Sequence, residues 1–260
     1  MKYILTGAEG FIGNAVLEEL KYSGHYVWEI HQDKHRWEDD LALEAMVKQC
    51  DGIFHIGAIS DTTEQDPNYM LYWNYTTSKI LFDLARKFDK KVVYSSSAAN
   101  YGNGDGIPNN IYGWSKLLAE EYGLKACKKF IALRYFNVYG PGEEHKDKMA
   151  SIAYQAYKAG EFKLFPGDIK RDFVYINDVV HANIHAMSLE RGVFDVGTGI
   201  AETFESLVEG MEISYTYHTK DKIPSWYQFY TKADNKKFMP GWIPEWNVKD
   251  GTSNYRELLG

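Results

Sequence analysis

Two residues near the middle of the chain have the side-chain types and the spacing of a proton-transfer site. Tyr112 and Lys116 stand four positions apart in the segment NIYGWSK, residues 110–116. On a helix, residues at i and i+4 lie on the same face, so the phenol and the ammonium would project together. A phenol has an ordinary pKa of about 10, and a nearby ammonium favours its ionised form. We therefore expect Tyr112 to be an acid–base group whose pKa is lowered by Lys116.

Ser97 adds a hydroxyl to this pair. It ends the run SSS, residues 95–97, directly after the apolar segment KKVVY. Ligands of parallel sheets bind at the carboxyl ends of strands, which is where this serine would lie. Its hydroxyl could hydrogen-bond the substrate oxygen that Tyr112 deprotonates. The Y-x-x-x-K spacing alone occurs by chance in many helices, so the prediction depends on finding a cofactor site as well.

A glycine motif at the start of the chain predicts that cofactor site. Gly7, Gly10 and Gly13 form G-x-x-G-x-x-G between a short apolar run and a segment with helical spacing. Glycine permits the tight turn and lets the backbone approach a pyrophosphate. The helix that follows offers free N–H groups and the positive end of its dipole to the phosphates. The motif predicts a dinucleotide site.

The kind of dinucleotide depends on the end of the second expected strand. Folds that bind NAD usually carry an acidic residue there for the ribose 2′-hydroxyl. In this chain the position falls on His31, followed by Gln32, and the basic residues Lys34 and Arg36 come soon after. A basic cluster suits a 2′-phosphate, so we expect NADP, with NAD as the alternative. The same residues could also form a solvated charged loop.

Strand-like and helix-like segments alternate along the first two thirds of the chain. Apolar runs at 2–7, 25–31, 51–58, 90–97 and 129–137 predict strands, and the segments 11–25, 69–88 and 112–126 predict helices. Such alternation predicts an α/β fold of Rossmann type, a doubly wound parallel sheet. We expect an NADP-binding core at 1–165. Residues 166–260 should form mainly a small irregular C-terminal substrate lobe, with 172–197 returning to the core.

Composition narrows the class of protein further. The 29 basic and 36 acidic residues give a net charge of −7, which argues against a nucleic-acid partner. Cys50 and Cys127 stand at no metal-ligand spacing, so we expect reduced thiols and no metal site. The N-terminal apolar run is too short for a signal peptide or a membrane span. We therefore expect a cytoplasmic protein with no membrane partner.

Taken together, these motifs resemble the extended short-chain dehydrogenase/reductase family, whose members mostly act on nucleotide-sugars. The glycine motif, Ser97, Tyr112 and Lys116 carry the resemblance, supported by HIGA at 55–58, Asn74, and RYFNVYGPG at 134–142. The resemblance implies NADP, a nucleotide-diphosphate sugar as substrate, and a homo-oligomer. The cofactor-binding residues that it implies are Gly7, Gly10, Phe11, Ile12, Gly13, His31, Gln32, Lys34, Arg36, Ile56, Gly57, Ala58, Ser60, Asn74, Tyr112, Lys116 and Val138.

Four downstream segments resemble one branch of this family, the ADP-L-glycero-D-manno-heptose 6-epimerases: residues 134–151, 170–179, 194–204 and 226–234. Inverting a secondary alcohol through a flat ketone requires the hydride to return to the opposite face, so either the ketone turns in the pocket or the proton donor changes sides. In the second case one group removes the first proton and another supplies the last. The resemblance implies Lys146 as the second proton carrier beside Tyr112. The catalytic set is then Ser97, Tyr112, Lys116 and Lys146.

The same branch implies the substrate contacts. Gln155 stands where these epimerases carry a histidine, and Arg171 has the planar fork that suits a diphosphate. The substrate-binding residues that we expect are Ser97, Asn137, Lys148, Gln155, Phe165, Pro166, Gly167, Asp168, Arg171 and Tyr227.

Three other functions stay open. A nucleotide-sugar 4-epimerase needs only the serine, tyrosine and lysine, all of which are present. An NADP-dependent reductase would use the same residues and release its cofactor in each cycle. A non-catalytic NADP-binding protein could share the fold, although such relatives usually lose the tyrosine or the lysine.

Overall fold

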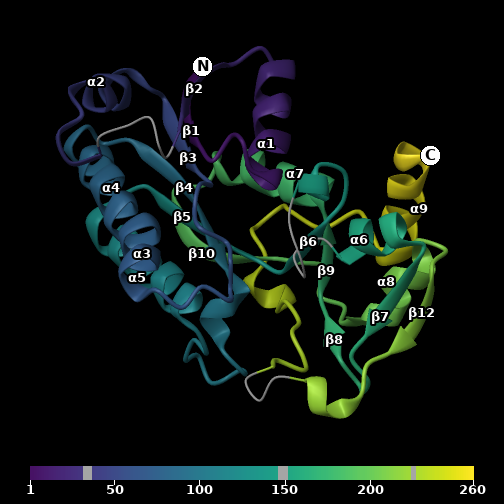
Figure 1. Cartoon of the computed structure of the whole chain (residues 1–260). Coiled ribbons are helices and arrows are strands. Elements are labelled where there is room, and N and C mark those ends of the chain that lie inside the picture. Colours follow the sequence, from purple (N-terminus) through teal and green to yellow (C-terminus); the bar gives the residue numbers. More distant parts are fainter. Residues whose placement is uncertain (32–36, 146–151, 224–226) are drawn as a thin grey trace. The chain divides into compact units, whose positions relative to one another are not determined.

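The structure is a computed structural model that describes residues 1–31, 37–145, 152–223 and 227–260 (Figure 1). The chain divides into two compact units. The first holds residues 1–134 and 180–194, and the second holds residues 135–179 and 195–260. Residues 135–165, which we expected in the core, group with the second unit, because strand β6 (Asn137–Tyr139) pairs there with β9 (Phe173–Tyr175). Of residues 172–197, which we expected to return to the core, residues 180–194 group with the first unit.

The first unit is organised around a six-stranded sheet in the order β2-β1-β3-β4-β5-β10. Its strands are β1 Lys2–Thr6, β2 Tyr26–Ile30, β3 Gly52–His55, β4 Lys91–Ser97, β5 Phe130–Tyr135 and β10 Arg191–Val196. The pairs β1–β2, β1–β3 and β3–β4 are parallel. The strand order reverses direction at β1, and ligands of open α/β sheets bind beside such a reversal. The predicted Rossmann-type fold is confirmed.

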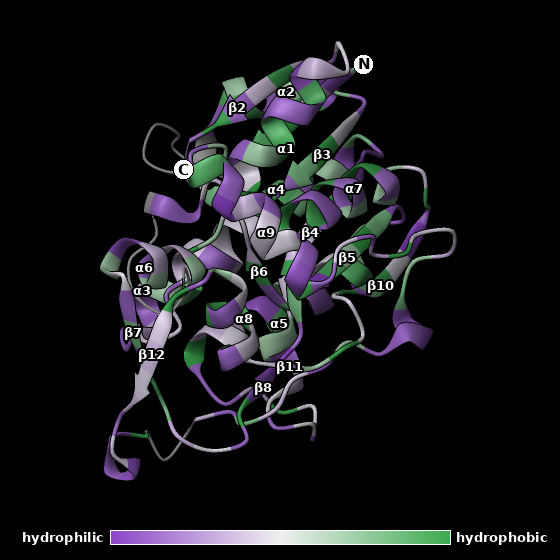
Figure 2. Cartoon of the chain, turned by 90° about the vertical axis from the view of Figure 1, so that its right-hand side faces the viewer, coloured by the Kyte–Doolittle hydropathy of each residue, from purple (hydrophilic) through white to green (hydrophobic). Residues whose placement is uncertain are grey.

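Helices cover both faces of this sheet. They are α1 Phe11–Tyr22, α2 Leu41–Gln49, α3 Pro67–Leu71, α4 Thr77–Lys87 and α5 Ile111–Ala126, with single turns η1 Trp37–Asp39 and η3 Ala98–Tyr101. Figure 1 shows α4 and α5 on one face and α1 on the other. The strands between them are apolar, as the colouring of β4 and β5 in Figure 2 shows. Val92, Tyr94, Phe130 and Ala132 of these two strands are fully buried.

The helix predicted at 69–88 is interrupted. A π-helical turn, η2 (Tyr72–Thr76), separates α3 from α4. The wider turn places Asn74 inside the unit, where its amide bonds both backbone groups of Ile59 and the Ser115 hydroxyl. Such π-turns occur frequently at functional sites. The sequence did not predict the break, because the apolar spacing continues through it.

The described residues of the second unit form three two-stranded sheets. Besides β6 and β9, it pairs β7 (Glu161–Leu164) with β12 (Ser214–Tyr217), and β8 (Lys170–Arg171) with β11 (Glu202–Thr203). Its helical elements are α6 Ile152–Ala159, α8 Phe204–Gly210, α9 Val248–Leu259, η4 Glu143–His145, η6 Lys220–Lys222 and η7 Asn235–Lys237. Helix α7, Ile176–Ala186, begins in this unit and ends in the first. The second unit is thus assembled from short elements that are separated in the sequence.

Helix α9 is not among the helices that the sequence predicts. Asn247 caps it by accepting a hydrogen bond from the Asp250 N–H. Its buried positions are Val248, Gly251, Thr252 and Tyr255. These four have helical spacing, but two of them are small or polar, so an apolar pattern does not reveal them.

Two further observations concern the cysteine thiols and the possibility of a membrane span. Both cysteines are unpaired and buried. In the part of the chain that the structure describes, no helix combines the length and the hydropathy that a membrane span requires.

Candidate active site

The glycine loop joins β1 to α1 at the reversal of the strand order. Gly7 has a positive φ of 74°, and a Cβ built on it would lie 2.5 Å from the Gly57 Cα. A Cβ on Gly13 would lie 1.8 Å from the Gly7 carbonyl oxygen. The turn after β1, the turn after β3 and the first turn of α1 therefore meet so closely that only glycine fits. This is the close backbone approach that a dinucleotide phosphate site requires.

The first turn of α1 has no side-chain cap. Gly10 is the N-cap and offers no side chain to accept hydrogen bonds from the turn, and the turn holds no acidic residue. Phe11 is buried, whereas Ile12 is partly exposed. Such a helix start favours binding of an anion.

An acidic residue lies beside His31, but it is not at the end of the second strand, where NAD-binding folds usually carry one. The His31 imidazole Nδ1 pairs with the carboxylate of Glu9, which belongs to the glycine loop. The other residues expected to choose between NADP and NAD, Gln32, Lys34 and Arg36, lie outside the described residues.

The turn after β3 is fixed by the buried amide of Asn74. This side chain accepts from the Ile59 N–H at 2.7 Å and donates to the Ile59 carbonyl at 2.9 Å. It also donates to Ser115, on the helix of Tyr112, at 3.0 Å. Asn74 therefore positions the segment that carries Gly57, Ala58 and Ser60, and its amide is occupied by protein groups.

Ser97 and Tyr112 are brought together at the end of β4. Ser97 is the last residue of the strand, and η3 begins directly after it. Asn110 caps α5 by accepting from the Gly113 N–H at 2.8 Å. Gly113 allows α5 to approach η3, because a Cβ on it would lie 2.9 Å from the Ala99 carbonyl oxygen. The Ser97 and Tyr112 side chains are hydrogen-bonded to each other, and both residues are partly exposed.

Lys116 lies on the same side of α5 as Tyr112 but is buried, with 1% of its surface exposed. Its Nζ lies 4.5 Å from the centre of the Tyr94 ring, a cation–π contact. The Tyr94 ring stacks in turn on His55 of β3. Burial lowers the pKa of Lys116 to about 7, and the charge of Glu120 acts in the opposite direction.

These surroundings correct the expectation that Lys116 lowers the pKa of Tyr112. Burial raises the pKa of the Tyr112 phenol, and the hydrogen bond with Ser97 opposes that rise. A low-dielectric environment disfavours the phenolate and the ammonium alike. The side chains alone therefore do not produce a phenolate, and Ser97 is the group that favours it.

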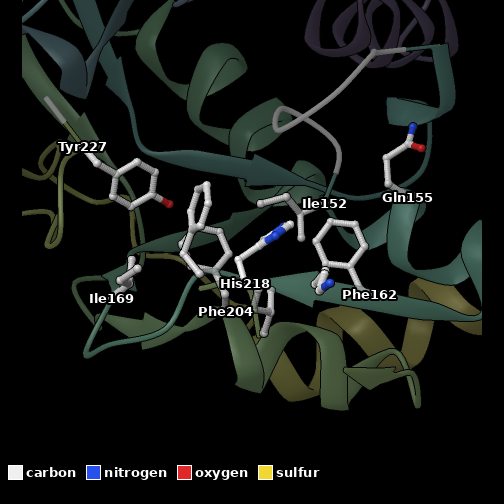
Figure 3. Close-up of a pocket in the computed structure, with 10 residues that line it drawn as sticks. Ile152, Gln155, Phe162, Ile169, Phe204, His218 and Tyr227 are labelled. Carbon is white, nitrogen blue, oxygen red and sulfur yellow. The ribbon is translucent and has the colours of Figure 1, made fainter. Parts of the chain in front are cut away.

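The second unit encloses a cavity of about 370 Å³, shown in Figure 3. Tyr227, Phe204 and His218 extend toward it, and Gln155 stands at its edge. The walls are mainly aromatic or aliphatic side chains from β7, α6, α8 and the segments around 169, 218 and 227. The lining residues are Ile152, Gln155, Phe162, Lys163, Leu164, Phe165, Ile169, Phe204, His218 and Tyr227.

A buried arginine side chain packs against two aromatic residues that line the cavity. Arg171 lies over the rings of Tyr227, at 5.4 Å, and Phe204, at 5.7 Å. Its guanidinium donates to the carbonyl oxygens of Lys170 and Gln228. Burial lowers the pKa of Arg171, and the neighbouring Tyr227 raises it. An arginine beside an aromatic cavity suits a ligand that joins an anion to a flat ring.

The expected substrate residues other than Ser97, taken together with Val138 of the cofactor set and Lys146 of the catalytic set, fall into four groups. Gln155, Phe165 and Tyr227 line the cavity, with Arg171 behind it. Pro166, Gly167 and Asp168 do not line it, and Asp168 is exposed and paired with Lys170 at 3.0 Å. Asn137 and Val138 lie on β6 of the same unit, where the Asn137 N–H donates to the Asp172 carbonyl. Lys146 and Lys148 lie outside the described residues.

Several residues of both regions were not predicted. Phe162 and Leu164 alternate along β7, so the strand pattern could have placed them on one face. His218 follows β12, and its N–H donates to the Leu164 carbonyl, a contact between segments far apart in the sequence. Glu120 stands four residues after Lys116, so the helical spacing that found Tyr112 could have found it too.

Comparison with known proteins identifies the family. Residues 3–197 match the NAD dependent epimerase/dehydratase family. The chain is 33% identical to ADP-L-glycero-D-manno-heptose-6-epimerase of Brachyspira hyodysenteriae, over 98% of this chain and 97% of that protein. That alignment extends over 312 positions, more than the 260 residues of this chain, so the relative carries insertions.

Solved structures agree on the fold. ADP-L-glycero-D-manno-heptose-6-epimerase of Helicobacter pylori superposes with a TM-score of 0.86 and is 29% identical, covering 99% of this chain and 96% of its own. UDP-glucose 4-epimerase of Thermotoga maritima, solved with UDP-glucose, has a TM-score of 0.83 at 24% identity, with coverages of 100% and 98%. The chain belongs to the NAD dependent epimerase/dehydratase family, a family of enzymes with epimerases among its members.

Proposed function

We propose that this protein epimerises a nucleotide-sugar, and that the sugar is ADP-glycero-manno-heptose, inverted at C6. The observation that carries the proposal is the hydrogen-bonded pair of Ser97 and Tyr112 in the same unit as the glycine loop, with Lys116 buried on the helix of Tyr112. The choice of sugar rests on the 33% identical relative from Brachyspira hyodysenteriae.

The glycine loop fits a dinucleotide, because a Cβ on Gly7, Gly13 or Gly57 would collide with the backbone of the neighbouring turns, and this close backbone approach is what a dinucleotide phosphate site requires. Gly7, Gly10 and the N-terminal turn of α1 would hold its phosphates, and the segment 56–60 would border it. When bound, the nicotinamide supplies the acceptor and later the donor of the hydride. Its positive ring would also favour the Tyr112 phenolate, which burial disfavours.

The side chains of this protein move the protons. Tyr112 takes the proton of the sugar hydroxyl as the alcohol becomes a ketone, while Ser97 donates a hydrogen bond to the same oxygen. For the hydride to return to the opposite face, either the ketone turns in the pocket or a second group supplies the proton to its oxygen. Lys146, outside the described residues, is our candidate for the second group because the family resemblance implies it.

The aromatic cavity is our candidate for the nucleotide end of the substrate. Its rings offer stacking surfaces for a base, and the nearby Arg171 suits the diphosphate. Tyr227 links the two, since it lines the cavity and lies against Arg171. Phe165 packs edge-on against Tyr227, which gives the wall a defined shape.

The cofactor is either NADP or NAD, and we propose NADP from the basic residues Lys34 and Arg36. The Glu9–His31 pair provides the counter-argument, since a carboxylate could bond the 2′-hydroxyl of NAD instead. Titration of the cofactor-free protein with each dinucleotide decides between them. Tighter NADP binding that weakens in Arg36→Ala supports the proposal, and tighter NAD binding that weakens in Glu9→Gln contradicts it.

The substrate is tested with a panel of nucleotide-sugars. Interconversion of the C6 epimers of ADP-glycero-manno-heptose, without added cofactor, is the expected result. Activity on a UDP-hexose at C4 and none on the heptose would keep epimerisation and overturn the substrate. Consumption of added NADPH in step with product would indicate a reductase. The homo-oligomer that the resemblance implies stays a prediction, which light scattering can test.

A further inference from the structure

A carboxylate that the proposed reaction does not use lies buried below the pair of Ser97 and Tyr112. Glu120 follows Lys116 by four residues on α5, and its side chain is fully buried. Tyr112, Lys116 and Glu120 thus occupy three successive turns on one side of the helix. A buried carboxylate requires partners, and the identity of these partners indicates its role.

Glu120 bonds the residues on both sides of Ser97. Its Oε2 accepts from the Ser96 hydroxyl at 2.5 Å and from the Asn100 amide at 3.2 Å. The Asn100 amide also donates to the Ser96 hydroxyl at 3.0 Å. Ser96 precedes Ser97 on β4, and Asn100 lies on η3, which begins directly after Ser97. One carboxylate therefore holds both ends of the short segment that carries the Ser97 hydroxyl.

Arg134 of β5 completes the arrangement. Its guanidinium donates to both oxygens of Glu120, at 2.5 Å and 3.1 Å. The same guanidinium lies 4.6 Å from the centre of the Tyr101 ring, the last residue of η3. Helix α5, strand β5 and the Ser97 segment are thereby joined through a single ion pair.

Stability alone gives a weak reason for this ion pair. Removing two charges from water costs about as much as their attraction returns, so buried pairs can often be replaced by apolar side chains. Geometry gives a better reason. The Ser97 hydroxyl must meet Tyr112 on a different element, and a displacement of about 1 Å in such a site can cost about 10²-fold in rate.

We propose that Glu120 is a positioning residue, which fixes the Ser97 segment to helix α5 so that the Ser97 and Tyr112 hydroxyls remain hydrogen-bonded. The inference rests on the proposed function for its catalytic meaning, whereas the positioning itself is testable without any sugar.

The test measures the pKa of Tyr112 by NMR of protein labelled with ¹³C at tyrosine Cζ, with the signal assigned by Tyr112→Phe. Loss of the Ser97 bond should raise that pKa, since the bond lowers it. The groups around Lys116 and Glu120 are Arg134, Tyr94, His55 and Tyr101. Removing only the charge of Glu120 would act on a phenol in the opposite direction and lower its pKa.

Three variants separate these effects. Ser97→Ala sets the size of the rise. E120M/R134M replaces the ion pair by apolar side chains of similar length, and Asn100→Ala removes one arm without changing any charge. We expect both to raise the pKa of Tyr112, with no further rise when each is combined with Ser97→Ala. Asp178→Asn alters a buried carboxylate of the other unit and should leave the pKa of Tyr112 unchanged.

The proposal would be overturned if E120M/R134M and Asn100→Ala both fold and the pKa of Tyr112 is unchanged or lowered in them. It would also be overturned if the rise in the pKa of Tyr112 in these variants adds to the rise caused by Ser97→Ala. With an active wild type, kcat should fall about 10²-fold in E120M/R134M while KM stays the same. If the wild type converts no nucleotide-sugar, the proposed function fails, and the NMR result still decides the role of Glu120.

Discussion

The polar network of the first unit and the aromatic cavity of the second are built from opposite kinds of side chain. The polar network, formed by Ser97, Tyr112, Lys116, Glu120 and Arg134, consists of charged and hydroxyl-bearing side chains. The aromatic cavity has ten lining residues, most of them apolar or aromatic.

The two regions also differ in how far along the sequence their residues are collected. Three members of the polar network come from one helix at four-residue intervals, with Ser97 at the end of the preceding strand. The cavity draws on segments from residue 152 to residue 227. Proton transfer depends on exact atom positions, which short-range structure fixes well, whereas a ring can stack on any suitable surface. We therefore expect substitutions in the network to act on rate and those in the cavity to act on binding.

The largest expected effect separates rate from binding. Tyr112→Phe removes the proton acceptor but keeps the ring, so kcat should fall about 10³-fold while nucleotide affinity stays unchanged. Turnover of the nucleotide-sugar and calorimetric titration with ADP measure the two. Tyr122→Phe, on the same helix but bonded to Asp83, should keep its activity. A Tyr112→Phe enzyme with kcat near that of the wild type would remove the network from the reaction.

The next effect concerns the glycine loop. In Gly13→Ala the new Cβ would lie 1.8 Å from the Gly7 carbonyl oxygen, so the loop must shift. We expect a loss of about 1–3 kcal/mol in the free energy of unfolding and weaker dinucleotide binding. In Gly24→Ala the new Cβ would meet no atom within 4 Å, and this variant should keep dinucleotide affinity. Equal affinity for dinucleotide in the two variants would contradict the proposed cofactor site.

In the aromatic cavity, Phe165→Ala should weaken ADP binding about tenfold, because base–aromatic stacking contributes about 1–3 kcal/mol. At saturating nucleotide-sugar, kcat should stay within about twofold, since the network that moves protons is intact. Phe238→Ala removes a ring that packs on Trp242 outside the cavity lining and is the matched control. A fall in kcat without a change in ADP affinity would reverse the expected division between the regions.

The smallest effect is a pH dependence of stability. The pKa of Lys116 is about 7 in the folded protein, below its ordinary 10.5, so between these values the unfolded chain binds a proton that the folded protein lacks. Stability from this group therefore rises with pH through that window. Relative to Lys116→Met, the wild type should gain about 1 kcal/mol between pH 6 and pH 8. Denaturant unfolding of both proteins at pH 6 and pH 8 measures this gain. If the difference in free energy of unfolding between wild type and Lys116→Met is the same at both pH values, the lowered pKa of Lys116 is contradicted.

Sequence reasoning succeeded where local spacing carries the information. The strand ending at Ser97, the helix with Tyr112 and Lys116, and the loop with Gly7 all follow from patterns of seven residues or fewer. It did not find the break at Asn74, because a π-turn keeps the apolar spacing on both sides. Helix α9 was missed because Gly251 and Thr252 occupy its inner face.

The aromatic cavity was only partly predictable for a different reason. Phe165, Gln155 and Tyr227 came from the family resemblance, whereas His218 enters through the pairing of β12 with β7. Nothing in the local sequence specifies which strand another will pair with. The pKa of Tyr112 was also predicted in the wrong direction, since spacing places two groups on one face but says nothing of how deeply they are buried.

The most direct test of the account uses ADP-glycero-manno-heptose with deuterium at C6 in ordinary water, without added cofactor. Both C6 epimers should form and both should retain the deuterium, because the hydride leaves and returns within one enzyme molecule. Epimerisation with loss of deuterium to the solvent would show that C6 is deprotonated instead, and would contradict the assignment of Ser97, Tyr112 and Lys116.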